Sequence, residues 1–216
     1  MRAICAVLLA SGVLSVMGPV VASGQGRLVG VKAGVNFATM GGADLNEFET
    51  ACSCNAATRT AFDVGGFVSF DLSPVLKLRP ELHYVGKGTK LEIAGTTLSI
   101  NTSYVEIPVL LVVAPRVAGA IHPSLFGGGA LALKAGCSLS GGGSSTGCGS
   151  VGFDVKSLDY GVVFGAGLGY AMRSGEVLFD VRYNLGLADF LDTSPSVALE
   201  YRGLAVTAGY SFRIGR

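Results

Sequence analysis

Ten charged side chains occur at alternate positions of segments whose intervening residues are apolar. The acids are Asp63, Glu81, Glu106, Asp159 and Asp180, and the bases are Lys32, Lys77, Arg79, Arg182 and Arg213. Acids and bases on equivalent faces can neutralise one another, and an unpaired buried charge is costly. Two roles remain open for this set. It can form a network of ion pairs that plugs an enclosed space, or it can line a narrow path for ions or small solutes.

Two histidines are the candidates for hydrolytic chemistry. His83 shares a face with Glu81, and His122 precedes Pro123 and Ser124. A serine hydrolase needs Ser and His within hydrogen-bonding reach, with a third group that orients the imidazole. A lipid hydrolase working at a bilayer edge is therefore a third alternative. We expect structural roles for both histidines and no enzymatic activity.

Two glycine-rich stretches have the composition of phosphate-binding loops without the context. Residues 165–169 read Gly-Ala-Gly-Leu-Gly, but a dinucleotide-binding loop opens a helix, whereas these glycines alternate along a predicted strand. Residues 141–145 contain no lysine, which a phosphate-binding loop requires. We therefore expect no cofactor.

Four cysteines remain after the N-terminal segment, and an even number in an exported chain suggests disulfides. Cys137 and Cys148 flank a Gly/Ser-rich segment and could pair to close that loop. A bond between Cys52 and Cys54, separated by one residue, would be strained, so their pairing stays uncertain. Metal binding is the alternative for all four, but neither histidine lies near them, and we expect no metal.

The N-terminus has the features of a secretory signal peptide. Arg2 supplies the positive charge, Ile4 to Val16 is apolar, and small residues follow, with cleavage expected after Ala22 or Gly24. The alternative is an uncleaved membrane anchor. Residues 1–24 would then be removed, and residues 25–216 would form one domain. Loss of Arg2 leaves 15 basic and 15 acidic residues, so no nucleic acid is expected as a partner.

The composition favours a membrane barrel over a spanning helix. Hydrophobic residue types make up 50% of the chain and charged ones 14%, against about 25% charged residues in soluble domains. The longest later apolar run, Val105 to Ala114, contains Glu106 and Pro108 and is too short to span a bilayer as a helix. Away from water, the remaining structure that satisfies every backbone polar group is a closed barrel.

The sequence predicts eight strands joined by alternately long and short connections. Their approximate bounds are 28–38, 59–70, 75–86, a fourth strand ending at 113, 121–134, 157–172, 176–187 and 199–214. Long loops are expected at Thr39 to Thr58 and at Ala135 to Gly152, while Lys87 to Gly95 is either a short loop or an extension of a hairpin. Long loops on one side and short turns on the other are typical of outer-membrane barrels.

Alternation along these strands decides which face meets lipid. In the seventh strand Val177, Phe179 and Val181 share one face, and Asp180 and Arg182 share the other. Large apolar groups outward and small or charged groups inward fit a barrel in lipid. A soluble periplasmic barrel with the opposite face assignment is the alternative.

Four segments resemble the PorT-like, or porin-family, outer-membrane β-barrel proteins. They are Gly30 to Ala38, Tyr104 to Leu111 with its Glu-Ile-Pro core, Asp180 to Leu187, and the closing Gly209 to Phe212. The resemblance spans nearly the whole mature chain and implies fold and location, but little about activity. Many barrels of this family end on an aromatic residue. This chain departs from that pattern, because Arg213 to Arg216 follow the aromatic Phe212.

Together these features predict an all-β, eight-stranded antiparallel up-and-down transmembrane β-barrel in the bacterial outer membrane. Its expected role is structural or interactive, with a plugged lumen and two presented loops. The expected partners are membrane lipid, the barrel-insertion machinery, and an extracellular protein or small solute. We expect a monomer. The alternatives are a narrow channel or part of a transport or secretion assembly, followed by the lipid hydrolase.

Overall fold

A computed structural model describes residues 27–93, 96–151, 156–188 and 200–214. The predicted signal peptide lies outside these residues. The elements are β1 (Arg27–Gly41), α2 (Leu45–Cys52), β2 (Cys54–Ala57), β3 (Arg59–Asp71), β4 (Leu76–Ile93), β5 (Thr96–Val113), β6 (Ile121–Gly141), β7 (Ser144–Gly147), the 3-10 helix η1 (Cys148–Val151), β8 (Leu158–Ala171), β9 (Glu176–Gly186) and β10 (Glu200–Ile214). None of the described helices is long and apolar enough to span a membrane.

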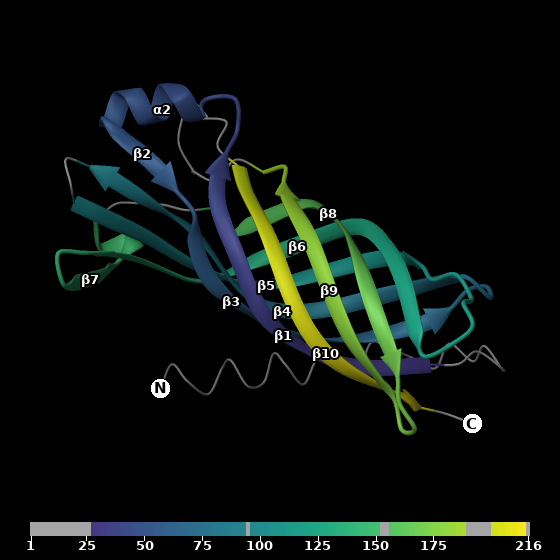
Figure 1. Cartoon of the computed structure of the whole chain (residues 1–216). Helices are drawn as coiled ribbons and strands as arrows, with labels where there is room; N and C mark the ends of the chain where they lie inside the picture. Colours follow the sequence, from purple (N-terminus) through teal and green to yellow (C-terminus); the bar gives the residue numbers. More distant parts are fainter. Residues whose placement is uncertain (1–26, 94–95, 152–155, 189–199, 215–216) are drawn as a thin grey trace.

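Eight strands close into an antiparallel ring (Figure 1). The order is β4-β3-β1-β10-β9-β8-β6-β5, and pairing of β5 with β4 completes the circle. The seam between the first and last strands runs over the full length of β1, from Arg27 opposite Ile214 to Gly41 opposite Glu200. The predicted barrel is thereby confirmed. The described sheet has ten strands because the short β2 and β7 pair with β4 and β6 outside the ring.

Short turns gather at one end of the ring, where β3–β4, β5–β6 and β8–β9 are joined. In the first of these turns, the Ser73 hydroxyl accepts hydrogen bonds from the backbone N–H groups of Val75 and Leu76 at 3.3 and 3.0 Å. A serine side chain that caps backbone donors in this way stabilises a tight turn.

The opposite end carries a folded extension, here called the surface extension: α2, β2, β7, η1 and the outer parts of β4, β5 and β6 (Figure 1). The prediction of loops at Thr39–Thr58 and Ala135–Gly152 was wrong in large part. β1 continues to Gly41 and β6 to Gly141, and α2 and β2 fill much of the first connection. The stretch Lys87–Gly95 extends a hairpin, since β4 pairs with β5 up to Ile93 opposite Thr96.

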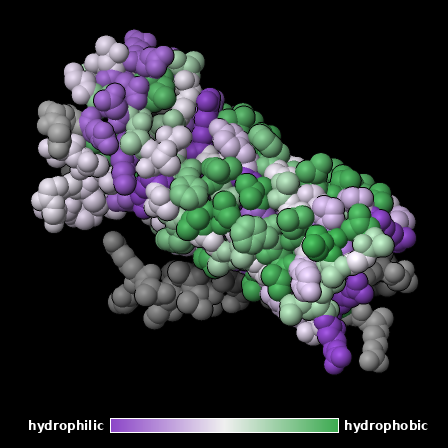
Figure 2. Space-filling model, in the orientation of Figure 1, coloured by the Kyte–Doolittle hydropathy of each residue, from purple (hydrophilic) through white to green (hydrophobic). Residues whose placement is uncertain are grey.

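The outer surface of the ring is apolar and the interior is polar. On β3, Phe62 and Val64 are 49% and 47% exposed, whereas Asp63 between them is 1% exposed. Figure 2 shows hydrophobic groups gathered along the barrel wall and hydrophilic groups concentrated toward its ends. The soluble alternative needs the opposite arrangement, so it is wrong.

Glycines inside the ring make room for the charged side chains, as the alternation in β8 predicts. A Cβ atom on Gly167 would strike the carboxylate of Asp180 and lie 2.9 Å from the Ser124 hydroxyl. A Cβ on Gly165 would lie 2.8 Å from the Phe126 ring. These glycines therefore let bulky groups from neighbouring strands cross the lumen.

Candidate functional site

The centre of the lumen is filled by seven polar side chains, each 1–5% exposed. We call them the ion-pair layer: Lys32 of β1, Asp63 of β3, Arg79, Glu81 and His83 of β4, and Asp180 and Arg182 of β9. They are brought together because four strands direct alternate residues to the same height inside the ring. Three acids face three permanent cations, so the layer is internally compensated apart from the imidazole.

Glu81 is the hub of the ion-pair layer. Its Oε1 atom lies 2.7 Å from Lys32 Nζ and 2.9 Å from Arg79 Nε. Its Oε2 atom lies 2.9 Å from His83 Nε2 and 3.1 Å from Arg182 Nη1. One buried carboxylate thus contacts four side chains from three strands.

Asp63 and Asp180 complete the layer on either side of that hub. Asp63 accepts from Arg182 Nη2 at 2.5 Å and lies 2.6 Å from His83 Nδ1. Asp180 accepts from Lys32 at 2.7 Å and lies 3.4 Å from Arg79 Nη2. His83 therefore has a carboxylate at each ring nitrogen. This is a bridging position, with no described serine within hydrogen-bonding distance of the ring.

Aromatic rings cover the layer on its short-turn side. The Arg79 guanidinium carbon lies 5.5 Å from the Phe67 ring centroid and 4.8 Å from that of Phe126. Lys32 Nζ lies 5.0 Å from the Phe67 centroid. These contacts let cations pack against apolar surface.

A second buried group lies further toward the surface extension. Lys87 Nζ is 2.9 Å from Glu106 Oε2 and 3.1 Å from Asp159 Oδ2. The remaining oxygens of both acids and the side-chain amide of Asn184 have no hydrogen-bond partner among the described residues. They line a cavity of about 10 Å³, which is the size of one water molecule.

Tyrosines and apolar side chains close the lumen beyond Lys87. The Tyr104 and Tyr201 rings meet edge to face with centroids 5.9 Å apart, and Thr102 Oγ1 is 2.6 Å from the Tyr201 hydroxyl. Six further buried residues pack around them: Met40, Cys54, Val85, Leu91, Ile100 and Ala132. The lumen is thus sealed twice, by charge in the middle and by apolar packing near the extension.

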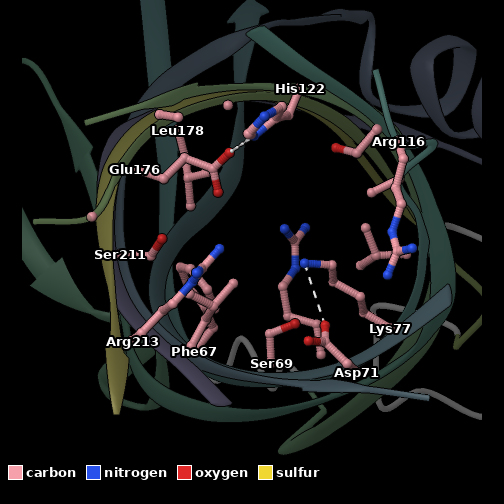
Figure 3. A pocket seen from close by; sticks show the side chains of 18 of the residues that line it. Phe67, Ser69, Asp71, Lys77, Arg116, His122, Glu176, Leu178, Ser211 and Arg213 are labelled. Carbon is pink, nitrogen blue, oxygen red and sulfur yellow. Dashed lines mark hydrogen bonds and ion pairs between the residues drawn. The ribbon is translucent and has the colours of Figure 1, made fainter. Parts of the chain in front are cut away.

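The short-turn end is open instead. A cavity of about 980 Å³, which we call the vestibule, enters there and ends at Phe67 and Arg79 (Figure 3). Its wall also includes His122 and Glu176, which are hydrogen-bonded with Nδ1 and Oε1 2.8 Å apart. Ser124 donates to the Gly167 carbonyl oxygen at 3.4 Å, so the described contacts do not join Ser124 to His122 as a nucleophile and base.

Eight of the ten predicted lumen charges are buried together, in the ion-pair layer or around Lys87. Lys77 and Arg213 are not. Lys77 lies at the vestibule wall with Asp71 3.4 Å away, and Arg213 is exposed near the end of β10. Alternation assigns a face but not a depth, which explains both errors. Lys87 and the bridging role of His83 were missed, although continuing the alternation from Glu81 through His83 would have marked Lys87.

The structure joins Cys137 to Cys148 and Cys52 to Cys54. Both bonds lie in the surface extension, the first at the β7 hairpin and the second at the end of α2. Among the described residues no group of three or more His, Cys, Asp or Glu side chains could hold a metal ion.

The first disulfide carries a prediction. Replacing both Cys137 and Cys148 by serine should make the β7 hairpin sensitive to protease, because a loop loses its covalent closure. Heat-dependent electrophoretic migration of the barrel should stay unchanged. Limited proteolysis of the purified protein with mapping of the cut site tests this, with Cys52→Ser/Cys54→Ser as the matched control. Cutting within the ring would contradict it.

The sequence matches the outer membrane protein beta-barrel domain over residues 22–192. The chain belongs to this family. No curated protein matches the sequence. Among solved structures, the outer membrane protein OprG from Pseudomonas aeruginosa is similar, with 11% identity, a TM-score of 0.59, and coverage of 89% of this chain and 97% of that one. Neisserial surface protein A is also similar, with 15% identity, a TM-score of 0.50, and coverage of 86% and 97%.

Membership of the outer membrane protein beta-barrel domain family agrees with the apolar outer surface of the ring and with its closure. The protein is a bacterial outer-membrane barrel, and its outward side chains contact membrane lipid. At such low sequence identity, the structural similarity indicates a shared fold alone.

Proposed function

We propose that this protein is a monomeric, non-enzymatic barrel that anchors the surface extension in the outer membrane and presents it to an extracellular partner. Residues 1–24 serve as the cleaved signal peptide, and the barrel machinery inserts residues 25–216. The finer family placement is PorT-like. The long connections then face the outside, because outer-membrane barrels keep their short turns on the periplasmic side.

One observation carries the proposal: the lumen is sealed while the extension is folded. The ion-pair layer and the Tyr104–Tyr201 packing close the passage in series. β4, β5 and β6 extend past the ring. Two disulfides connect the segments beside them, one joining α2 to β2 and the other joining β6 to η1. A rigid scaffold that displays connecting segments is a common arrangement for recognition.

The sealed lumen is tested by reconstituting the full chain in planar lipid bilayers. We expect a flat baseline with no discrete conductance steps at any applied voltage. Discrete steps from the folded, heat-modifiable protein would contradict the proposal and favour the narrow channel, for which the vestibule is the supporting observation.

The surface role is tested by a deletion that the geometry makes possible. The Cα atoms of Cys137 and Cys148 are 5.5 Å apart, so residues 138–147 can be replaced by Asn-Gly without moving the strands. We expect bacteria that carry this variant to lose adhesion to protein- and polysaccharide-coated surfaces. The change in electrophoretic migration of the barrel on heating, here called the heat shift, should stay normal. A matched variant with Asp71→Asn changes the other end and should adhere normally. Equal adhesion of the deletion variant would contradict the surface role.

A further inference from the structure

The vestibule has an excess of positive charge that its own residues do not neutralise. Three of its charged groups have partners of their own: Arg79 pairs with Glu81 and Asp180, Lys77 pairs with Asp71, and Glu176 is hydrogen-bonded to His122. The guanidinium groups of Arg116, Arg173 and Arg213 have no ion-pair partner among the described residues and line the same cavity. The vestibule is thus a blind-ended, cationic pocket.

Two of these arginines face each other across the opening. Arg116 lies in the connection after β5, and Arg213 lies on β10. β5 and β10 are four positions apart in the eight-stranded ring, so the two residues are on opposite walls, as Figure 3 shows. A guanidinium offers a planar set of donors suited to carboxylate and phosphate oxygens. An anion between them would be contacted from both sides.

A buried hydroxyl group points to a ligand at the same place. Ser211 is two residues before Arg213 on the same face of β10 and is 0% exposed, and its Oγ atom has no hydrogen-bond partner among the described residues. Figure 3 shows its oxygen directed into the cavity. Buried polar atoms are normally paired, and an oxygen of a bound anion would provide the partner.

The remaining wall is apolar. Phe67 closes the floor, and Leu28, Val112 and Leu178 line the sides. Cationic groups at the mouth and apolar groups below are the features of a pocket that orients an amphiphilic solute.

We propose that the vestibule binds a small organic anion that carries a carboxylate or phosphate group and an apolar portion. The anionic group lies between Arg116 and Arg213, the Ser211 hydroxyl donates to it, and the apolar portion packs against Phe67 and Leu178. The site opens at the short-turn end, opposite the surface extension, and the inference does not depend on the surface role.

Isothermal titration calorimetry of the full chain in uncharged detergent tests this with phenyl phosphate and inorganic phosphate as probes. We expect saturable binding of phenyl phosphate, stronger than that of inorganic phosphate and weakened by salt. The double variant Arg116→Gln/Arg213→Gln should bind phenyl phosphate with an affinity that is lower by about tenfold or by a larger factor. Lys90→Gln, which removes an exposed cation at the other end, should bind like the wild type.

Ser211→Ala separates binding from folding. We expect a loss of affinity for phenyl phosphate with an unchanged heat shift, because the hydroxyl makes no hydrogen bond to the part of the chain that the structure describes. The double variant must show the same heat shift as the wild type. Saturable binding that is equal in the wild type and the double variant would overturn the proposal. So would the absence of binding to the wild type at millimolar probe.

Discussion

Replacing Glu81 by glutamine is expected to lower the unfolding free energy of the barrel by about 3–5 kcal/mol, the usual cost of breaking a buried ion pair on one side. The neutral amide keeps the shape of the carboxylate but removes the charge that faces Lys32, Arg79 and Arg182. Its NH₂ group is a donor and faces the N–H donors of these cations, with which it cannot form a hydrogen bond. Urea unfolding of the protein in lipid, followed by the mobility shift, measures the change.

A substitution on the same strand provides the control. Glu92→Gln removes an exposed carboxylate at the outer part of β4 and should change the unfolding free energy by no more than about 0.5 kcal/mol. The double variant Glu81→Gln/Lys32→Met should recover part of the loss, since it removes the excess cation and again leaves two acids facing two permanent cations in the layer. Equal unfolding midpoints for Glu81→Gln and Glu92→Gln would show that the layer is not stabilising.

Replacing Val181 by arginine is expected to destabilise the folded barrel by about 2–4 kcal/mol, the cost of a cation near the bilayer midplane on a lipid-facing wall. Val181 is 42% exposed, lies in the middle of β9, and points outward between the buried Asp180 and Arg182. In a water-soluble protein the same change at an exposed site would cost about 0.5 kcal/mol or less. Urea unfolding in lipid vesicles measures the difference.

The control for depth is Val75→Arg. Val75 is 44% exposed and lies in the turn between β3 and β4, where about 0–1 kcal/mol is expected at the interface. A Val181→Arg variant as stable as Val75→Arg would mean that water, and not lipid, surrounds the middle of the ring.

Most of the ring could be predicted from the sequence because its walls alternate strictly. The bounds expected for the seventh strand, 176–187, differ by one residue from β9, and the short turns were placed correctly. Alternation stopped being informative in the surface extension. Residues 135–141 of β6 contain a single large apolar side chain, Leu139. The alternating hydrophobic pattern that marks a strand is therefore absent, and cross-strand pairing with β5 and β7 decides the conformation.

The partners inside the lumen could not be predicted, because they depend on register. A sequence places Glu81 and Arg182 on inward faces, but their contact requires β4 and β9 to bring them to the same height across the ring. Tyr201 shows the same limit, since it lies 4% exposed with its ring against that of Tyr104, a contact across the ring that the sequence does not indicate. The vestibule likewise becomes visible only in the closed ring, because its lining residues come from distant parts of the sequence and from opposite walls.

The ion pairs also impose an order on assembly. Lys32 and Asp180 are 148 residues apart, and Asp63 and Arg182 are 119 apart. β9 reaches β1 only through β10, so these pairs form once the last strand has joined the first. Until then a partly inserted sheet carries uncompensated charges into the bilayer, which is unfavourable. Seam closure and charge neutralisation are therefore a single late step. Weakening the layer should act mainly on how fast the native barrel opens, because contacts formed after the transition state govern the unfolding rate.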